Sequence, residues 1–133
     1  MFIFDQSIET GNQIIDSEHR QLIDAINRLL ESCVRGDAAS QSEKAIQFLN
    51  QYVHLHFSHE EQLQLQYGYP DYARHKMLHE GYKKVVADLT TEYSKQGPSP
   101  TMLNKLNTNI GGWLITHIKR EDKALAAYIQ KKG

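Results

Sequence analysis

The stretch from His56 to His79 carries the side chains of this sequence that are best suited to bind a metal ion. His56 and Glu60 are four residues apart, and so are His75 and His79. Positions four apart on an α-helix differ in direction by only about 40°, so each pair points to one side of its helix. The sequence GYP at 68–70 between the pairs is typical of a turn. Two helices joined there would aim three imidazoles and a carboxylate at one shared axis, which is the geometry of a metal site.

Apolar residues recur every three or four positions along most of the chain, which predicts amphipathic helices around these residues. We expect Asp16 to cap a first helix that runs to about Arg35. We expect a second helix, capped by Ser40 or Ser42, to end at Gly68. A third helix should follow with residue 71 in its first turn, and the GPSP segment at 97–100 should separate it from a fourth.

Four such helices joined by short connections fit an all-α, up-down-up-down four-helix bundle. Residues 1–15 lack the helical period, so we expect an extended N-terminal arm that docks through Phe2, Ile3, Phe4 and Ile8. With 133 residues, the chain 1–133 is expected to form a single domain.

Each predicted helix places imidazoles or carboxylates on the face where a core normally has leucine. These residues are His19 on the first helix, His56 and Glu60 on the second, His75 and His79 on the third, and His117 with an acid beyond it on the fourth. Burying so many unpaired polar groups would cost several kcal/mol each, at roughly the scale of the whole stability of a domain. A metal centre removes this cost.

The ligand types narrow the choice of metal. Imidazoles and carboxylates without thiolates suit iron, manganese or zinc, and there are too many of them for one tetrahedral zinc ion. Two octahedral ions fit better. With two bridging carboxylates and one oxygen bridge, they would leave one position open for a small diatomic molecule.

Four stretches of the chain together carry a resemblance to a known family. They read IDSEHRQL at 15–22, HFSHEE at 56–61, YP at 69–70 followed by His75 and His79, and WLITHI at 113–118 followed by Asp122. Together they resemble the hemerythrin family, and most closely the bacteriohemerythrins, over nearly the whole chain to about Lys123. The resemblance implies a hemerythrin-like domain with a non-haem di-iron centre that binds O2 reversibly, with an oxo or hydroxo bridge between the Fe2+ or Fe3+ ions.

The resemblance also implies a role for each residue. It places three histidines on one iron, two on the other and two carboxylates between them, namely His75, His79 and His117; His19 and His56; and Glu60 and Asp122. The iron with two histidines would be the O2 site. The walls of the O2 pocket would be Trp113, Leu114 and Ile118, which also suit a simple core.

Asp122 follows His117 by five residues, which on a regular helix would turn its carboxylate about 140° away. Glu121 would point correctly on a regular helix and is the candidate if the helix is regular. The resemblance favours Asp122, so we expect a π-type bulge, a kink or a helix end between His117 and Asp122. The glycines at 111–112 just upstream permit a close helix approach or a bend.

The remaining polar residues near the predicted site are expected to have other roles. His54 should face solvent, and Glu61 is expected to be a surface charge. His59 is expected at the boundary or on the surface, with a supporting position next to the metal ligands as the alternative. Glu18 is expected in the first helical turn, where an acid complements the helix dipole. Four residues depart from the family pattern: Glu18, Phe4, Gln64 and Tyr82 occupy positions where the family often has Gln, Trp, Met and Phe. The partner of the Tyr82 hydroxyl is not evident.

The overall composition limits the partners. The net charge of −1, with 23% charged residues, gives no electrostatic preference for nucleic acid or an anionic membrane, so neither is an expected partner. A single cysteine, Cys33, and no apolar leader predict a cytoplasmic protein. No protein partner is evident, and a monomer is expected.

The leading functional hypothesis is O2 carriage, storage or scavenging by a protein that is not an enzyme, with NO as a further possible ligand. The alternatives are an O2 or redox sensor acting through a separate partner, and a slow di-iron oxidase or nitric oxide scavenger. The sequence lacks the Glu-x-x-His pairs of ferritin-like proteins and the His-Glu-x-x-His of zinc proteases. Both absences argue against an enzyme of those classes.

Overall fold

The structure of the protein is a computed structural model that describes residues 2–35 and 40–132, with only the backbone described at 40–42. The predicted caps at Ser40 and Ser42 therefore lie outside the described side chains. Within the described ranges the chain is helical and contains no strand.

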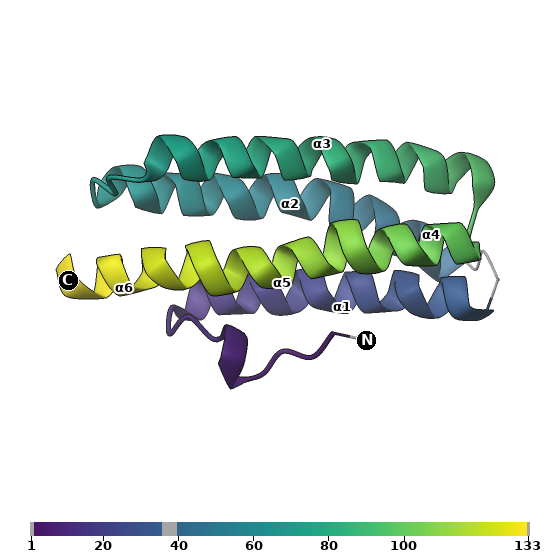
Figure 1. The fold of residues 1–133 in the computed structure, drawn as a ribbon, viewed down its shortest axis with the longest axis horizontal. Helices are drawn as coiled ribbons and strands as arrows, with labels where there is room; N and C mark the ends of the chain where they lie inside the picture. Colours follow the sequence, from purple (N-terminus) through teal and green to yellow (C-terminus); the bar gives the residue numbers. More distant parts are fainter. Residues whose placement is uncertain (1, 36–39, 133) are drawn as a thin grey trace.

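Four antiparallel rods form the body of the molecule (Figure 1). The first three are α1 (Gln13–Arg35), α2 (Ser40–Gln66) and α3 (Tyr72–Gln96). The fourth rod is a continuous run of five segments, α4 (Pro100–Lys105), η2 (Leu106–Gly112), α5 (Trp113–His117), η3 (Ile118–Asp122) and α6 (Lys123–Lys132). The predicted all-α, up-down-up-down bundle is confirmed.

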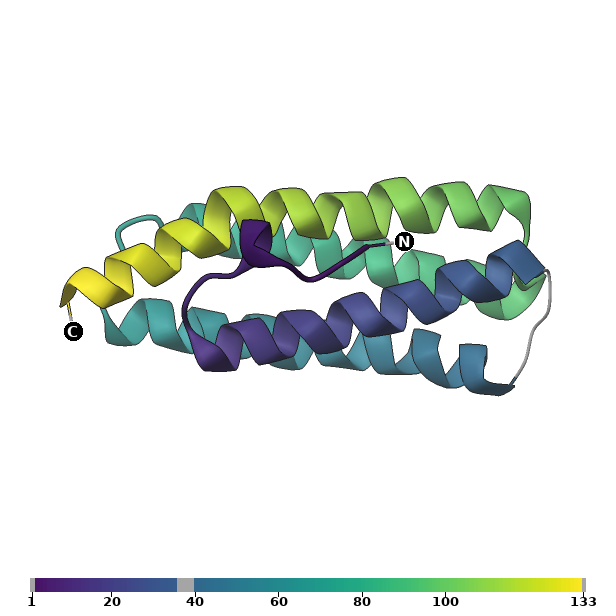
Figure 2. The same ribbon diagram turned by 90° about the horizontal axis from the view of Figure 1, so that it is seen from below.

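The N-terminal arm comprises residues 2–12 and contains a short 3-10 turn, η1 (Gln6–Ile8), so it is not extended throughout. Figure 2 shows it running along α1 and the fourth rod. Ile8 is buried, and Phe2 and Phe4 pack against the core, as expected. The docking predicted for Ile3 is wrong, because this side chain is 74% exposed.

The first helix begins four residues earlier than predicted, and its cap is different. Asn12 Oδ1 accepts a hydrogen bond from Ile15 N (3.1 Å), which is the contact of a capping residue. Asp16 lies inside the first turn and turns back to the arm, where it accepts from the backbone N–H (2.9 Å) and hydroxyl (2.8 Å) of Thr10. Asp16 therefore fixes the arm to the helix instead of capping the helix.

The turn between α2 and α3 lies where the sequence predicts it, at residues 68–70. Gly68 has φ +64°, in the left-handed region that favours glycine, and ends α2. The N–H of Tyr69 donates to the carbonyl of Gln64 (2.8 Å), closing the helix end. Residue 71 precedes α3 instead of lying in its first turn.

The fourth rod is irregular at two places. At η3 the N–H of Lys123 donates to the carbonyl of Ile118, five residues back, so the predicted π-type bulge between His117 and Asp122 is confirmed. At η2 the wide turn contains Gly111, where a Cβ would lie only 2.1 Å from a ring carbon of Phe2. The close approach predicted for the glycine pair is thus made by the arm and not by a helix.

Candidate metal centre

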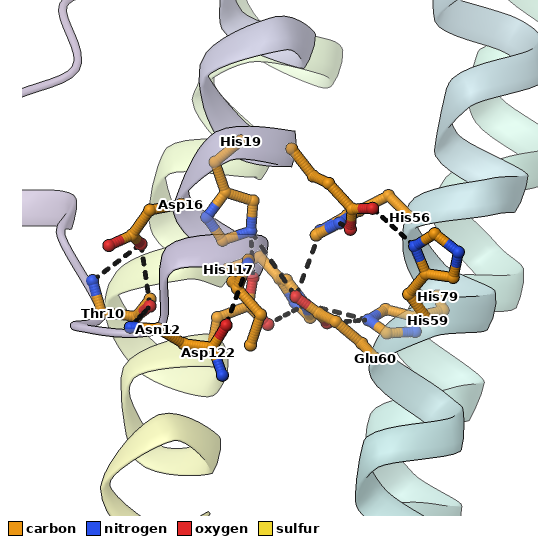
Figure 3. Close-up of polar contacts among 12 residues, drawn as sticks. Thr10, Asn12, Asp16, His19, His56, His59, Glu60, His79, His117 and Asp122 are labelled. Carbon is orange, nitrogen blue, oxygen red and sulfur yellow. Dashed lines mark hydrogen bonds and ion pairs between the residues drawn. The ribbon is translucent and has the colours of Figure 1, made fainter.

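The seven side chains predicted as metal ligands converge in the middle of the bundle. Their donor atoms form two groups, each with all atoms within 4.8 Å of one another: Glu60, His75, His79, His117 and Asp122; and His19, His56, Glu60 and Asp122. All seven are buried, with His117 the most exposed at 4%. Figure 3 shows His19, Glu60, His117 and Asp122 directed to a common point between the rods.

The two carboxylates connect the two groups. Asp122 directs Oδ1 to the Nε2 atoms of His75 and His117 (both 3.2 Å) and Oδ2 to that of His19 (2.9 Å). Glu60 directs Oε1 to Nε2 of His79 (3.3 Å) and Oε2 to Nε2 of His56 (3.1 Å). Each carboxylate therefore has one oxygen on each group, which is the arrangement a bridging ligand needs.

The donor set fits metal ions. The Nε2 atoms of His75 and His79 lie 3.1 and 3.2 Å from that of His117, so three imidazole nitrogens face one point. Nε2 of His19 and His56 and all four oxygens of Glu60 and Asp122 are buried without an aligned hydrogen-bond partner. Such orphaned groups cost about 1–3 kcal/mol each, more when charged. Cations between the two groups would remove that cost.

Comparison with known proteins identifies the family. A sequence model described as the hemerythrin HHE cation binding domain matches residues 10–129. The chain belongs to the hemerythrin family. Two similar proteins are bacteriohemerythrins: that of Stenotrophomonas maltophilia is 28% identical over 98% of this chain and 82% of the relative, and that of Methylococcus capsulatus is 31% identical over 81% and 80%.

A crystal structure of wild-type hemerythrin superposes on this fold with a TM-score of 0.80 at 26% identity, covering 97% of both chains. The resemblance to bacteriohemerythrins is thus confirmed. Hemerythrin membership and the buried cluster of histidines and carboxylates fit a di-iron protein that binds oxygen. None of the described helices combines the length and apolar character that a membrane span requires.

The charges in the hemerythrin core are strongly coupled when no metal is bound. Burial alone would lower the pKa of His56, but the charge of Glu60 and the hydrogen bond to Glu18 raise it to about 10. Burial and Asp122 would raise the pKa of Glu60, yet His56 and His19 hold it far below its usual range. Protons on the imidazoles therefore balance the buried carboxylates, and metal ions must displace these protons.

Two carboxylates outside the predicted ligand set hold the far side of two imidazoles. Glu18 Oε1 lies 2.8 Å from Nδ1 of His56, and its Oε2 lies 2.5 Å from Nδ1 of His59. Glu61 Oε2 lies 2.9 Å from Nδ1 of His79. Metal-binding histidines usually donate their second ring N–H to such a group, which fixes the ring orientation and tautomer.

These contacts correct two predictions, those for Glu18 and Glu61. Glu18 is buried and holds a histidine, and Glu61, with a side chain only 14% exposed, is not a surface charge. His59 is half-exposed, as a boundary residue should be, but it also holds Glu18. Glu18 and Glu61 each adjoin a predicted ligand in sequence and lie about 100° from it on the helix. In a bundle that direction leads to the neighbouring helix, and this signal could have identified both.

The predicted O2-pocket residues lie beside the imidazoles. The Trp113 ring stacks on His117 at 4.5 Å between centroids and on Tyr82 at 4.1 Å. Leu114 and Ile118 are fully buried. The sequence analysis did not single out Phe57, whose ring stacks on that of His79 with 3.7 Å between centroids. Its position directly after His56 could have indicated that it lies near the metal ligands.

Three further residues from the sequence analysis have clear positions. His54 is exposed, as expected. Glu121 is paired with Arg74 at the edge of the bundle, so the wide turn at η3 leaves no support for it as the alternative to Asp122. The Tyr82 hydroxyl donates to the carbonyl of Ile110 (2.9 Å), the partner that the sequence did not reveal.

Proposed function

We propose that this protein binds O2 reversibly at a di-iron centre and serves as an oxygen carrier, store or scavenger, not as an enzyme. Hemerythrins are in general oxygen-binding proteins without catalytic turnover. The observation that carries the proposal is the convergence of five buried imidazoles and two shared carboxylates on the bundle axis.

In this proposal the three-histidine group and the two-histidine group each hold one iron. The ligands are His75, His79 and His117 on one ion, His19 and His56 on the other, and Glu60 and Asp122 between them, with an oxo or hydroxo bridge completing the pair. The division follows the two groups of donor atoms and the split contacts of each carboxylate. The two-histidine ion has one imidazole fewer and is therefore the proposed O2 site.

When bound, the iron pair supplies the electrons that O2 takes up on binding and returns on release. The side chains around it keep the site dry and rigid. Leu114 and Ile118 exclude water, and Trp113 covers His117 by stacking. Glu18 and Glu61 hold the rings of His56 and His79 in place. NO is a further ligand that such a pocket would admit.

We further propose that residues 1–133 act as one domain, in the cytoplasm and as a monomer. The contacts of the arm with the bundle support the proposal of a single domain. The backbone of Phe2 forms two hydrogen bonds with the side-chain amide of Asn27 on α1 (3.0 and 2.8 Å).

Optical spectra under controlled gas test the function. The protein is loaded with Fe2+ under argon, exposed to O2 and returned to argon. A visible absorption band that appears with O2 and disappears under argon is the expected result. Irreversible oxidation with continuing O2 consumption would instead favour a slow oxidase. The absence of any spectral change with O2 would contradict the proposal.

A further inference from the structure

Gln64 is a buried polar side chain to which the proposed function assigns no role. It is 0% exposed, and neither its Nε2 nor its Oε1 has a hydrogen-bond partner. Among the described residues, the other buried polar side chains are either the seven candidate ligands or have partners of their own, namely Asp16 with Thr10, Glu18 with His56, and Ser32 with Tyr93. A buried amide with no partner in the protein requires an explanation.

The position of Gln64 relates it to the metal centre. It follows Glu60 by four residues on α2, so it lies on the same inward side and about 6 Å further along the axis. This displacement leads toward the turn that ends α2. The fourth rod runs in the same direction as α2 (Figure 1). Trp113 and Leu114, two of the three predicted pocket residues, precede His117 on that rod, so they lie on the opposite side of the centre. Gln64 therefore approaches the centre from the side away from the predicted O2 pocket.

The chemistry of the neighbouring groups indicates what the amide binds. The carboxylates of Glu60 and Asp122 only accept hydrogen bonds when ionised, so a direct contact would satisfy Nε2 of Gln64 but leave Oε1 without a donor. A water molecule can donate to Oε1 and to a carboxylate at the same time. A buried water typically has two to four polar partners, and the amide with two carboxylates provides that number.

We propose that Gln64, together with the carboxylates of Glu60 and Asp122, binds a water molecule on the side of the metal centre away from the O2 pocket. The water positions the two carboxylates through hydrogen bonds, so Gln64 is a positioning residue. Carboxylates that bind metals are usually held by such contacts, and losing one typically weakens metal binding. The proposal depends on the proposed di-iron function, because the carboxylates must be metal ligands.

The test compares Gln64→Met with Gln62→Met, the same substitution at an exposed position of α2. Methionine keeps the length of glutamine and removes both hydrogen-bonding atoms. Iron affinity, measured by competition with a chelator, should fall about tenfold in Gln64→Met and stay unchanged in Gln62→Met. Pulsed EPR of the one-electron-reduced di-iron form in D2O should show an exchangeable deuterium signal, to which a hydroxo bridge and the ring N–H groups also contribute, and Gln64→Met should lose the part of this signal that the bound water adds.

The deuterium signal separates a bound water from simple packing. Unchanged affinity and an unchanged deuterium signal in Gln64→Met would overturn the proposal. Lower affinity with an unchanged signal would also overturn it, because the amide would then act without water. Gln64→Leu replaces Gln64→Met if the latter does not fold. The two proposals can fail separately. If the wild-type protein shows the reversible O2 band and Gln64→Met has the iron affinity and deuterium signal of the wild type, this inference is refuted and the proposed function stands.

Discussion

Asp122 and Glu60 are each in contact with imidazoles of both groups, and this sharing determines how the centre is organised. Asp122 reaches His75, His117 and His19 with two oxygens, the longest of the three distances being 3.2 Å. No imidazole belongs to both groups of donor atoms, whereas each carboxylate does. Removing one histidine should therefore weaken one ion, whereas removing one carboxylate should affect both.

The first prediction concerns the histidines. His75→Ala should lower the iron content sharply, because it removes a fully buried donor that faces His117 and Asp122. His54→Ala should leave the iron content unchanged, since His54 is an exposed residue of α2. Iron per chain after loading and desalting is the measurement. Equal iron content in the two variants would contradict the ligand assignment.

The second prediction concerns Glu18, which holds Nδ1 of His56. Glu18→Ala should weaken iron binding about 10–100-fold, because His56 loses the contact that fixes its ring. Glu18→Gln should weaken iron binding less than Glu18→Ala does, since the amide oxygen of glutamine can still accept a hydrogen bond from the ring N–H of His56. Chelator competition measures both. The matched control is Glu31→Ala on the exposed side of α1, and an equal effect of Glu18→Ala and Glu31→Ala would be inconsistent with an orienting role.

Among the elements, the fourth rod differs from the other three because its helix widens where the ligands must converge. His117 and Asp122 are five residues apart, and the π turn at η3 brings both to the same side. Glu121 remains at the edge with Arg74, which spans from α3 to the fourth rod. The irregular helix therefore selects which acid enters the core.

The third prediction follows from that selection. Asp122→Asn should reduce iron binding strongly, because the amide replaces one of two anionic oxygens shared by both ion positions. Glu121→Gln should keep the iron and lose only the partly exposed ion pair with Arg74, worth about 1 kcal/mol. Iron content and urea unfolding measure the two effects. Loss of iron in Glu121→Gln with retention in Asp122→Asn would show that the regular-helix alternative holds in solution.

Periodicity was sufficient to predict the helices and most of their inward residues, because an apolar stripe such as Leu22, Ile26 and Leu30 can be buried only if the segment is helical. The π turn was predictable only because the hemerythrin resemblance favoured Asp122 as a ligand, and a regular helix would turn a residue five positions after His117 away from the site. By contrast, Glu18 and Glu61 lie beside the stripes. Their burial depends on how the helices pack, which one helix's sequence does not specify.

The N-terminal arm shows the same limit. Its apolar residues predicted docking, but the choice between Ile3 and Phe2 depends on a distant feature. Phe2 packs where Gly111 leaves no Cβ, and Ile3 faces solvent. The capping role of Asp16 failed for a similar reason, since the arm supplies donors that turn its carboxylate away from the helix end.

For the molecule as a whole, the buried charges link stability to metal binding and pH. The pKa values of His19, His56 and His75 are raised when no metal is bound: burial alone would lower them, and the carboxylates of Glu60 and Asp122 outweigh it. The metal-free protein is thus held together partly by imidazolium–carboxylate pairs. The metal-loaded protein would replace those protons with cations.

The fourth prediction is that the metal-free protein loses stability as the pH rises from 6.5 to 9. A histidine whose pKa is higher in the folded than in the unfolded protein stabilises the fold. Its contribution is complete at pH values below the unfolded-state pKa, about 6.5. It declines as the pH rises toward the folded-state pKa, which is about 10 for His56. The free energy of unfolding should fall by on the order of a few kcal/mol across this range. Urea denaturation with a chelator present measures it. His56→Gln should flatten the pH dependence and His54→Gln should not, and a stability that stays constant or rises with pH in the wild type would show that the core histidines are neutral without metal.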